Sequence, residues 1–165
     1  MGRNIYVRNT YAILQRMVKA KPSRQGRQSG TQKDPFYWTN AHTKHRLRVH
    51  LVWVPKYRKR VLQGPVAVRL EELLRQATEV NRWQIHELAI QPDHVHLLLQ
   101  IRPPESVSSV VNLLKGRTSR IVRAEFPQLE EFLWGESFWA DGYFAESVGQ
   151  VEEAVVSAYI RNQQR

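Results

Sequence analysis

QIHELAIQPDHVHLLLQI, residues 84–101, carries the clearest structural signal in the chain. Two runs rich in apolar residues flank the pair Pro92 and Asp93. Proline cannot donate a hydrogen bond to a strand ladder, and Pro-Asp is typical of turns. We therefore predict that the two runs are antiparallel strands joined at this pair as a β-hairpin.

Segments with strand or helix periodicity surround this hairpin. RLRVHLVWV, residues 46–54, alternates at period two and is predicted to be a strand. Residues 66–82 and 106–126 each place apolar side chains on one helical face. SFWADGYFAES, residues 137–147, is predicted to be the final strand, and residues 151–163 the final helix. The order β-α-β-β-α-β matches the split βαβ pattern, so we expect a ferredoxin-like α+β sandwich: an antiparallel sheet with helices on one face, plus the last helix.

Charge divides the chain into two parts. Residues 1–60 contain 15 Lys and Arg against Asp34 alone, whereas the whole chain has 25 basic and 15 acidic residues. Residues 1–40 include a stretch rich in Lys, Arg, Ser, Gly and Gln that lacks apolar side chains for a core. We predict a basic, flexible arm over residues 1–40 and one folded domain over residues 41–165. The basic excess suits a polyanion such as DNA or RNA, although a solvated tail has the same composition.

The composition excludes several kinds of protein. No cysteine is present, which rules out disulfides, thiolate metal sites and cysteine nucleophiles. No apolar run reaches the ~18 residues that a membrane helix needs, and the first residues do not resemble a secretory signal. We therefore expect a protein of the cytoplasm that contacts no membrane and is associated with the nucleoid when it is bound to DNA.

His94 and His96 are candidate metal ligands. Residues two apart on a strand point to the same face, so both imidazoles project together while Val95 points the other way. Two neighbouring imidazoles can share a divalent ion, but they can also line a polar face, and an isolated His-x-His pattern more often does so. A catalytic ion needs a third protein ligand or the substrate to complete its coordination.

The final predicted helix offers both a third ligand and a nucleophile. Tyr159 and Gln163 are four residues apart and so share one helical face. The amide oxygen of Gln163 suits a hard ion such as Mg²⁺ or Mn²⁺, and the Tyr159 phenol can attack a metal-polarised phosphate. Without the histidines, Tyr159 would be interpreted as a core residue with its hydroxyl at the rim. Tyr143 is the rival nucleophile, but no amide follows it at helical spacing.

Two basic clusters are candidate phosphate contacts. One follows the strand of residues 46–54 and the other lies on the helix of residues 106–126, and together they comprise Lys56, Arg58, Lys59, Arg60, Lys115, Arg117 and Arg120. Basic side chains also occur on ordinary solvated faces. As two clusters beside a phosphate-handling site, they favour DNA binding.

Five ordered motifs resemble one family of enzymes. They are HLVWVPKYRKRVL (50–62), PDHVHLLLQI (92–101), LLKGRTSRIV (113–122), FWADGYFAESVG (138–149) and YIRNQ (159–163). They span about residues 44–165 and resemble the small single-tyrosine HUH transposases of the IS two-hundred and IS six-hundred-and-five insertion sequences. Five motifs in order are far more specific than a lone His-x-His.

The resemblance implies a metal-dependent endonuclease and transposase. His94 and His96 would be the metal ligands, Gln163 would complete the metal site, and Tyr159 would form a 5′-phosphotyrosine with single-stranded DNA. The resemblance also implies recognition of DNA hairpins at the transposon ends. It further implies a homodimer with shared active sites, in which the tyrosine helix of one subunit faces the histidines of the other.

The chain departs from the family at both ends. Residues 1–40 have no counterpart in the usual short amino terminus of the family. Six residues follow Tyr159, whereas family members generally continue further, so we expect fewer contacts to anchor the tyrosine helix.

Two other functions compete with transposition. The same scaffold commonly binds RNA or single-stranded DNA on its sheet without catalysis. A domesticated relative could instead keep the chemistry and process repeats for the host. A pure binding module has no need for His94, His96, Tyr159 and Gln163 together, so the sequence favours the enzyme.

Overall fold

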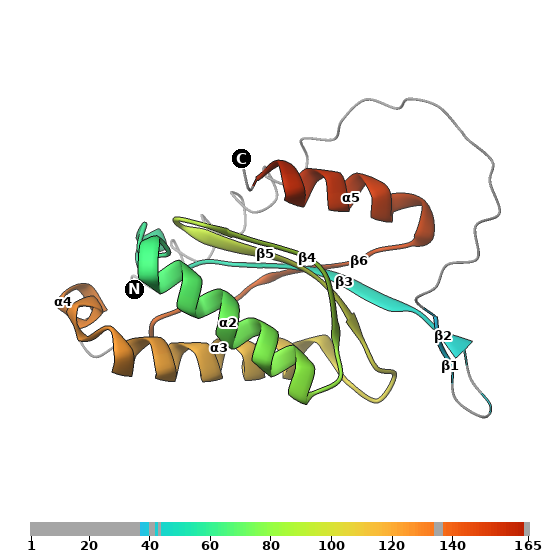
Figure 1. Ribbon diagram of the computed structural model, residues 1–165, viewed down its shortest axis with the longest axis horizontal. Helices are drawn as coiled ribbons and strands as arrows, with labels where there is room; N and C mark the ends of the chain where they lie inside the picture. Colours follow the sequence, from blue (N-terminus) through green and yellow to red (C-terminus); the bar gives the residue numbers. More distant parts are fainter. Residues whose placement is uncertain (1–36, 40–41, 43, 134–136, 164–165) are drawn as a thin grey trace, which may run out of the picture.

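The computed structural model describes residues 37–39, 42, 44–133 and 137–163. Most of the predicted basic arm, residues 1–40, lies outside the described residues. The end of that segment is paired, because β1 (Trp38–Thr39) forms a short antiparallel ladder with β2 (Lys44–His45). The rest of the described chain has the predicted α+β architecture (Figure 1).

A four-stranded antiparallel sheet organises the body. Its strands lie in the order β4-β5-β3-β6, and they are β3 (Leu47–Trp53), β4 (Gln84–Gln91), β5 (His94–Ile101) and β6 (Phe144–Ser147). The hairpin predicted at Pro92 and Asp93 is confirmed, with Gln91 paired opposite His94. β5 is a central strand, and all of its residues are buried.

Helices cover both faces of this sheet (Figure 1). α2 (Gly64–Val80) and α3 (Val107–Glu125) lie on one face, as predicted, while α5 (Gln150–Asn162) lies on the other. The remaining helical segments are short connections: η1 (Lys56–Arg58), η2 (Pro127–Leu129) and α4 (Glu130–Leu133). Within the described ranges, no helix combines the length and the apolar composition needed to cross a lipid bilayer.

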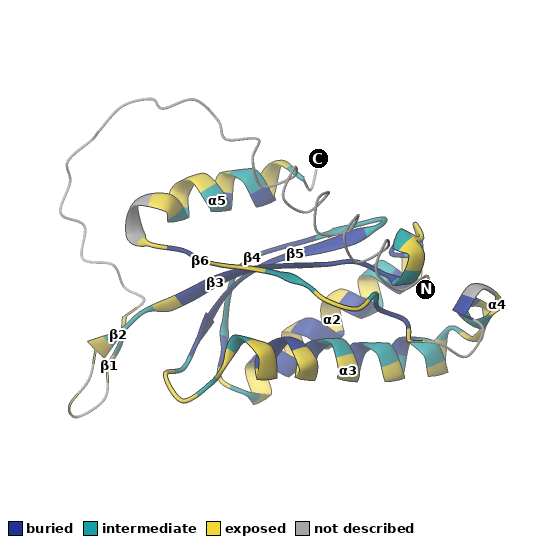
Figure 2. Cartoon of the chain, turned by 180° about the vertical axis from the view of Figure 1, so that it is seen from behind, coloured by how far each residue is buried: buried dark blue, intermediate teal, exposed yellow. Residues whose placement is uncertain are grey.

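The main core lies between the sheet and the pair α2 and α3 (Figure 2). Alternation along the strands sends Leu51 and Trp53 of β3, and Leu97 and Leu99 of β5, into this core. Each large apolar side chain buried in this way stabilises the fold by roughly 1.5–3 kcal/mol. The alternate positions of the same strands face α5, where Leu98 packs in a second, smaller apolar cluster.

The final strand is shorter than the sequence predicts. The pattern predicts one strand over residues 137–147, but β6 begins at Phe144. Upstream, Trp139 is buried in the main core and makes only an isolated bridge to Pro55. Gly142 then adopts a φ of +85°, which interrupts the extended backbone before the chain pairs with β3.

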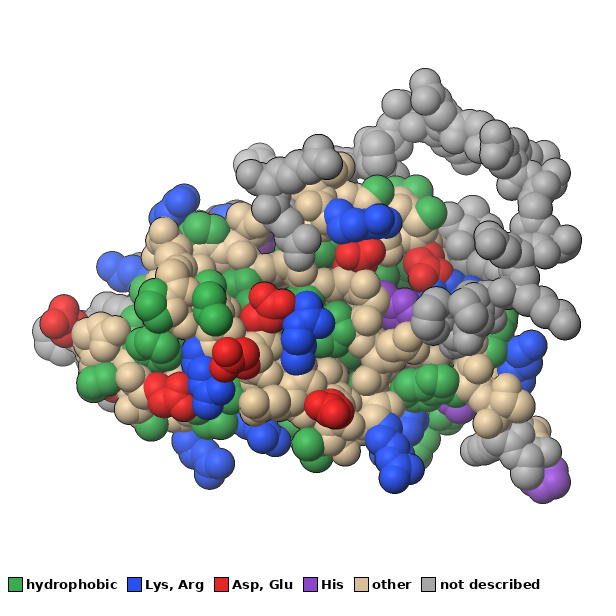
Figure 3. All heavy atoms as spheres, viewed as in Figure 1, with side chains coloured by type: hydrophobic (Ala, Val, Ile, Leu, Met, Phe, Trp, Pro, Cys, Tyr) green, Lys and Arg blue, Asp and Glu red, His purple; other side chains and the backbone are tan. Residues whose placement is uncertain are grey.

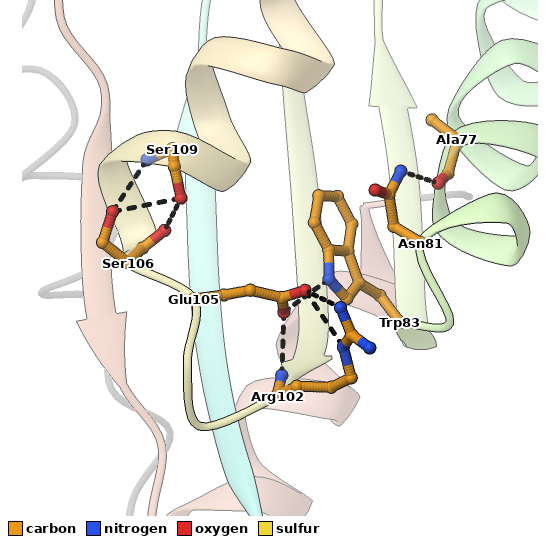
Figure 4. A network of polar contacts seen from close by, with 7 residues as sticks. All are labelled: Ala77, Asn81, Trp83, Arg102, Glu105, Ser106 and Ser109. Atoms are coloured by element: carbon orange, nitrogen blue, oxygen red, sulfur yellow. Dashed lines mark hydrogen bonds and ion pairs between the residues drawn. The ribbon is translucent and has the colours of Figure 1, made fainter.

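A polar network fixes the end of the sheet that is remote from the hairpin turn (Figure 4). Glu105 accepts hydrogen bonds from the indole of Trp83 (2.6 Å) and from the backbone (3.0 Å) and guanidinium (2.8 Å) of Arg102. Ser106 caps α3 by accepting from the backbone N–H of Ser109 at 3.1 Å. The start of β4 is therefore held to the start of α3.

Charged side chains of both signs are interspersed on the face that Figure 3 shows. On α2, Arg69 pairs with Glu72 and with Glu125 of α3, and Arg75 pairs with Glu71. Exposed pairs of this kind are worth about 0.2–1 kcal/mol each. Together they make the outer surface of α2 an ordinary solvated face.

Candidate active site

His94 and His96 lie together at the start of β5, on the sheet face that α5 covers. Their ring centroids are 4.8 Å apart and their planes are nearly perpendicular, at 83°. Both are buried, with 4% and 0% of their surfaces exposed. The predicted projection of both imidazoles from one face is confirmed.

Within the described residues, one nitrogen of each ring has a hydrogen-bond partner and the other has none. Nδ1 of His94 lies 2.6 Å from Oδ1 of Asp93, and Nδ1 of His96 lies 3.1 Å from Nε2 of His50. Nε2 of His94 and Nε2 of His96 are buried and have no hydrogen-bond partner among the residues that the structure describes. Buried polar atoms without a partner are rare and call for an explanation, which a bound ion would supply for these two.

The environment keeps these imidazoles neutral. Burial lowers the pKa of His96 from 6.5 to about 3, and its neighbours His94 and His50 add to the effect. Burial also lowers the pKa of His94, although Asp93 opposes it, and lowers the pKa of His50 to about 4. A neutral imidazole has a lone pair for a metal, so the pKa shifts suit a ligand role.

Tyr159 of α5 lies directly against His96. The two ring centroids are 5.5 Å apart and the planes meet at 87°. The Tyr159 ring also packs against the small apolar cluster formed by Ala89, Leu98, Val148 and Ile160. Burial raises the pKa of the Tyr159 phenol, so its hydroxyl holds a proton at neutral pH.

Gln163 lies at the same end of the sheet. Its backbone carbonyl accepts a hydrogen bond from the side chain of Gln91, the residue that pairs with His94 across the hairpin. Gln91 and Gln163 also line a cleft of about 410 Å³ beside α2. The structure thus brings Gln163 to the strand pair that carries His94, and its role as a ligand stays a prediction.

The imidazole nitrogens in this region suit a divalent ion, but the described side chains would coordinate one only in part. In the described part of the chain, no group of three or more His, Asp or Glu side chains is arranged to hold a metal. The two unpartnered Nε2 atoms could act as nitrogen donors, and oxygen atoms from Gln163 or from a substrate would be needed to complete the coordination. An incomplete coordination sphere of this kind leaves a ligand position that a phosphate oxygen could take.

Tyr143, the rival nucleophile, is placed elsewhere. Its ring packs against the main core, which lies on the α2 and α3 side of the sheet. Tyr159 and His96 are in contact on the α5 side. The geometry therefore favours Tyr159 as the nucleophile.

Ion pairs hold α5 on the sheet. Glu153 pairs with both Arg46 and Arg48, whose side chains are 8% and 1% exposed. Near the other end of the helix, Arg161 pairs with Glu87 of β4 at 3.1 Å. The position of Tyr159 depends on these anchors as well as on apolar packing.

The first predicted basic cluster is divided between two roles. Lys59 and Arg60 are exposed and Lys56 is half-buried beside the Tyr57 ring, so these three can meet a phosphate. Arg58 instead pairs with Asp93 at 2.8 Å. Burial pushes the pKa of Asp93 upward, but His94 and Arg58 outweigh that effect and hold its pKa below the ordinary value. Arg58 is thus tied to the histidine site.

The second predicted cluster is divided in the same way. Lys115 donates to the carbonyls of Ala140 (2.8 Å) and Gly142 (2.9 Å), so it braces the segment before β6. Burial lowers the pKa of Lys115. Arg120 is exposed and lines a groove of about 650 Å³ along α3, and Arg117 is half-buried on the same helix. Arg120 is the better placed of the three to meet DNA.

Sequence reasoning missed His50 and Glu153. The period-two pattern of β3 does place His50 on the same face as Arg48, but its contact with His96 depends on the register between β3 and β5. Glu153 reads as an ordinary acidic residue in the first turn of a helix. A sequence signal existed for the face of each residue, and none existed for its partner.

Comparison with known proteins identifies the family of this chain. Residues 43–163 match the family model described as "Transposase IS200 like". The ISDra2 transposase TnpA of Deinococcus radiodurans is 37% identical over 119 residues, which cover 72% of this chain and 85% of that protein. The transposase for insertion sequence element IS200 of Salmonella typhimurium is 34% identical over 123 residues, covering 74% and 80%. The crystal structure of a candidate transposase from Deinococcus radiodurans R1 has a TM-score of 0.64 at 33% identity and covers 76% of this chain and 97% of that one.

Proteins with this fold and these sequences are transposases, a class of enzymes that cleave and rejoin DNA. Within that class, this chain belongs to the IS200-like family, and the match extends from residue 43 to residue 163. The predicted fold and the resemblance to this family are thereby confirmed.

Proposed function

We propose that the chain cleaves and rejoins single-stranded DNA at insertion-sequence ends, with Tyr159 as the nucleophile and a divalent ion as cofactor. The contact between Tyr159 and His96, at 5.5 Å between ring centroids, carries this proposal. The Tyr159 ring is thus next to His96, whose buried Nε2, like that of His94, has no partner among the described residues. A nucleophile and metal ligands so close together can act on the same phosphate.

The proposed step exchanges one phosphate ester for another. The Tyr159 oxygen forms a bond to phosphorus while the bond from phosphorus to the 3′ oxygen breaks, which leaves a 5′-phosphotyrosine and a free 3′-hydroxyl. The phenol loses a proton and the departing 3′ oxygen gains one, so the step is balanced. The reverse attack by a 3′-hydroxyl rejoins the strand and frees the tyrosine.

His94, His96 and Gln163 are the proposed ligands of Mg²⁺ or Mn²⁺. The imidazoles contribute Nε2, and Gln163 contributes an amide oxygen of the kind that hard cations prefer. When bound, such an ion polarises the phosphate and stabilises charge as the new bond forms. Because the raised pKa keeps Tyr159 protonated, nucleophilic attack depends on loss of that proton at the phosphate.

DNA hairpins at the ends of the element are the proposed partners. The exposed Lys59 and Arg60, with Lys56, form one set of phosphate contacts, and Arg117 and Arg120 form a second set on α3. Phosphate contacts supply affinity and orientation, while sequence is read at base edges. The Lys and Arg residues of positions 1–40 add to the long-range electrostatic attraction for DNA.

A homodimer with shared active sites is the proposed assembly. In this chain, Tyr159 lies against its own His96, so one protomer already holds both parts. A dimer that exchanges its α5 helices would make the same contact with the tyrosine of the partner subunit. The two arrangements share the same chemistry and differ only in which chain supplies the nucleophile.

A non-catalytic binding module is disfavoured by the position of α5. Sheet-based modules present aromatic side chains on an open sheet face to the bases. Here α5 covers that face, and the residues beneath it, including His50 and Leu98, are 2% and 0% exposed. Such a face is not available for base stacking.

A cleavage assay tests the proposal. The purified chain is incubated with Mg²⁺ and labelled single-stranded DNA from the element's own ends, and protein–DNA adducts that survive denaturation are counted. We expect an adduct with the unaltered chain and with Tyr143→Phe, and none with Tyr159→Phe or with a chelator. An adduct that persists in Tyr159→Phe would refute the proposed nucleophile.

A further inference from the structure

Each candidate metal ligand is held by a hydrogen bond at the ring nitrogen that faces away from the proposed ion. Asp93 holds Nδ1 of His94 at 2.6 Å, and His50 holds Nδ1 of His96 at 3.1 Å. The opposite Nε2 atoms are buried and have no partner in the described chain. A ring fixed at one nitrogen presents the other in a fixed direction.

We propose that His50 and Asp93 are positioning residues that set the tautomers and orientations of His96 and His94, so that both Nε2 lone pairs are directed at one ion. This inference deepens the proposed function and rests on it. The carboxylate of Asp93 only accepts, so the proton of His94 sits on Nδ1 and its Nε2 is free of hydrogen. His96 can bind through Nε2 only with its proton on Nδ1, which then donates to Nε2 of His50.

The packing around His50 fixes the position of its ring next to His96. Val52 is the residue opposite His96, and His50 lies two positions along β3 on the same face, within diagonal reach. The rings of His50 and His96 are stacked with centroids 5.4 Å apart and planes at 14°. Phe144 of β6 meets the His50 ring edge-on at 5.9 Å. Because only 2% of the His50 surface is exposed, water cannot easily replace His50 as the hydrogen-bond partner of His96.

Asp93 is itself held in place from the opposite side. Its Oδ2 atom accepts from Nε of Arg58 at 2.8 Å, while Oδ1 faces His94. Tyr57 and Arg58 have φ values of +57° and +53°, a region that residues with a Cβ rarely adopt. The backbone N–H of Leu62 donates to the carbonyl of Pro92 at 3.0 Å and ties the same segment to the hairpin turn. The turn at η1 therefore aims Arg58 at the carboxylate that positions His94.

Substitutions can separate positioning from packing. His50→Phe keeps a ring of similar size and removes the acceptor, whereas His50→Gln supplies a new acceptor oxygen. Asp93→Ala and Asp93→Asn form the matching pair at a half-buried turn, where a substitution is better tolerated than in the sheet. His86→Phe is the control, because His86 is an imidazole of β4 whose Nε2 lies 3.1 Å from Gln100 and whose Nδ1 lies 3.9 Å from Glu153.

The measurement is the affinity of the full chain for Mn²⁺ in the absence of DNA. The electron paramagnetic resonance signal of the free ion reports how much Mn²⁺ is bound. We expect His50→Phe and Asp93→Ala to weaken Mn²⁺ binding about 10–100-fold, as loss of such partners typically does. We expect His50→Gln, Asp93→Asn and His86→Phe to stay within a few-fold of the unaltered chain. ¹⁵N spectra of the imidazoles should show Nδ1-protonated His96 in the unaltered chain and mixed tautomers in His50→Phe.

The outcomes distinguish this inference from the function on which it rests. If the unaltered chain binds Mn²⁺ and His96→Ala does not, the proposed metal site stands. Unchanged Mn²⁺ affinity in both His50→Phe and Asp93→Ala would then overturn the positioning roles alone. If the unaltered chain and His96→Ala bind Mn²⁺ equally weakly, the metal site fails and the positioning roles fail with it. Should His50→Phe not fold, as judged by circular dichroism, the Asp93 pair still decides the question.

Discussion

The ring of Tyr159 lies edge-on against the ring of His96, with centroids 5.5 Å apart. The contact joins α5 to β5, one of the two central strands of the sheet, so one packing interaction positions the candidate nucleophile next to a candidate metal ligand. Anything that displaces α5 from the sheet also displaces the nucleophile. The stability of this helix is therefore directly relevant to catalysis.

Glu153→Gln is expected to loosen α5. Glu153 pairs with Arg46 and Arg48, and the Arg48 side chain is buried. The substitution removes the negative charge that compensates the buried guanidinium. We expect the free energy of unfolding to fall by about 2–4 kcal/mol, because the pair is partly open to solvent. Urea unfolding at neutral pH measures the loss. Glu152→Gln, at the exposed neighbouring position, is the matched control and should lie within about 0.5 kcal/mol of the unaltered chain. Equal stability of the two variants would show that the ion pairs do not anchor the helix.

Lys115→Met and Arg120→Gln are expected to act differently, although both residues belong to one predicted DNA-binding cluster. Lys115 holds two backbone carbonyls, so its loss should lower the free energy of unfolding by about 1–3 kcal/mol. Arg120 is exposed, so its loss should leave stability unchanged and reduce by about 1 the slope of log affinity for hairpin DNA against log salt concentration. Unfolding and DNA titrations at several salt concentrations check both. A normal stability for Lys115→Met would return that residue to the DNA-contact set.

In the absence of metal, the free energy of unfolding is expected to decrease as the pH is lowered from 7.5 to 5. The folded chain holds His50 with a pKa of about 4, against 6.5 ordinarily, so in this range the unfolded chain binds a proton that the folded chain does not. Below about pH 6.5 unfolding therefore becomes easier as pH falls, by about 2 kcal/mol from His50 at pH 5, and His96 acts in the same direction. Urea unfolding in the presence of a chelator follows the change. The slope should flatten in His50→Phe, and an identical slope in that variant would contradict the assignment.

A mixture of two inactive variants is expected to recover activity. Tyr159→Phe lacks the nucleophile and His96→Ala lacks a ligand, so neither should form an adduct alone. In a homodimer with shared sites, one of the two sites in a mixed dimer receives an intact tyrosine and intact histidines, and adducts should reappear. If each site is built from one chain, as the contact within this protomer also allows, the mixture stays inactive. Labelled DNA and denaturing electrophoresis distinguish the two results.

Most of the fold follows from local pattern. The strand at residues 84–91, the hairpin turn and both long helices lie within about two residues of their predicted bounds, because period and turn chemistry are local properties. The segment of residues 137–147 was less predictable. The pattern FWADGYF suits a strand, but Trp139 is more stable in the main core than in a ladder.

The site was predictable only in part, and the reason is register. His94 and His96 share a face because period two requires it. The side chain that contacts each ring depends on the register between neighbouring strands, such as β3 and β5, and a sequence alone does not give that register. Arg58 and Lys115 show the same difficulty. Their charge suggested DNA contacts, yet in the folded chain Asp93 and two backbone carbonyls compete for them.

Identifying the residue that becomes covalently linked to DNA tests the proposed mechanism most directly. The covalent adduct is trimmed with nuclease, the protein is cut after glutamate, and the nucleotide-bearing peptide is sequenced by mass spectrometry. Cleavage after Glu153 releases Tyr159 in residues 154–165, while cleavage after Glu136 and Glu146 releases Tyr143 in residues 137–146. We predict the nucleotide mass on Tyr159, joined through its phenol oxygen. The same mass on residues 137–146, or an adduct on neither peptide, would contradict it.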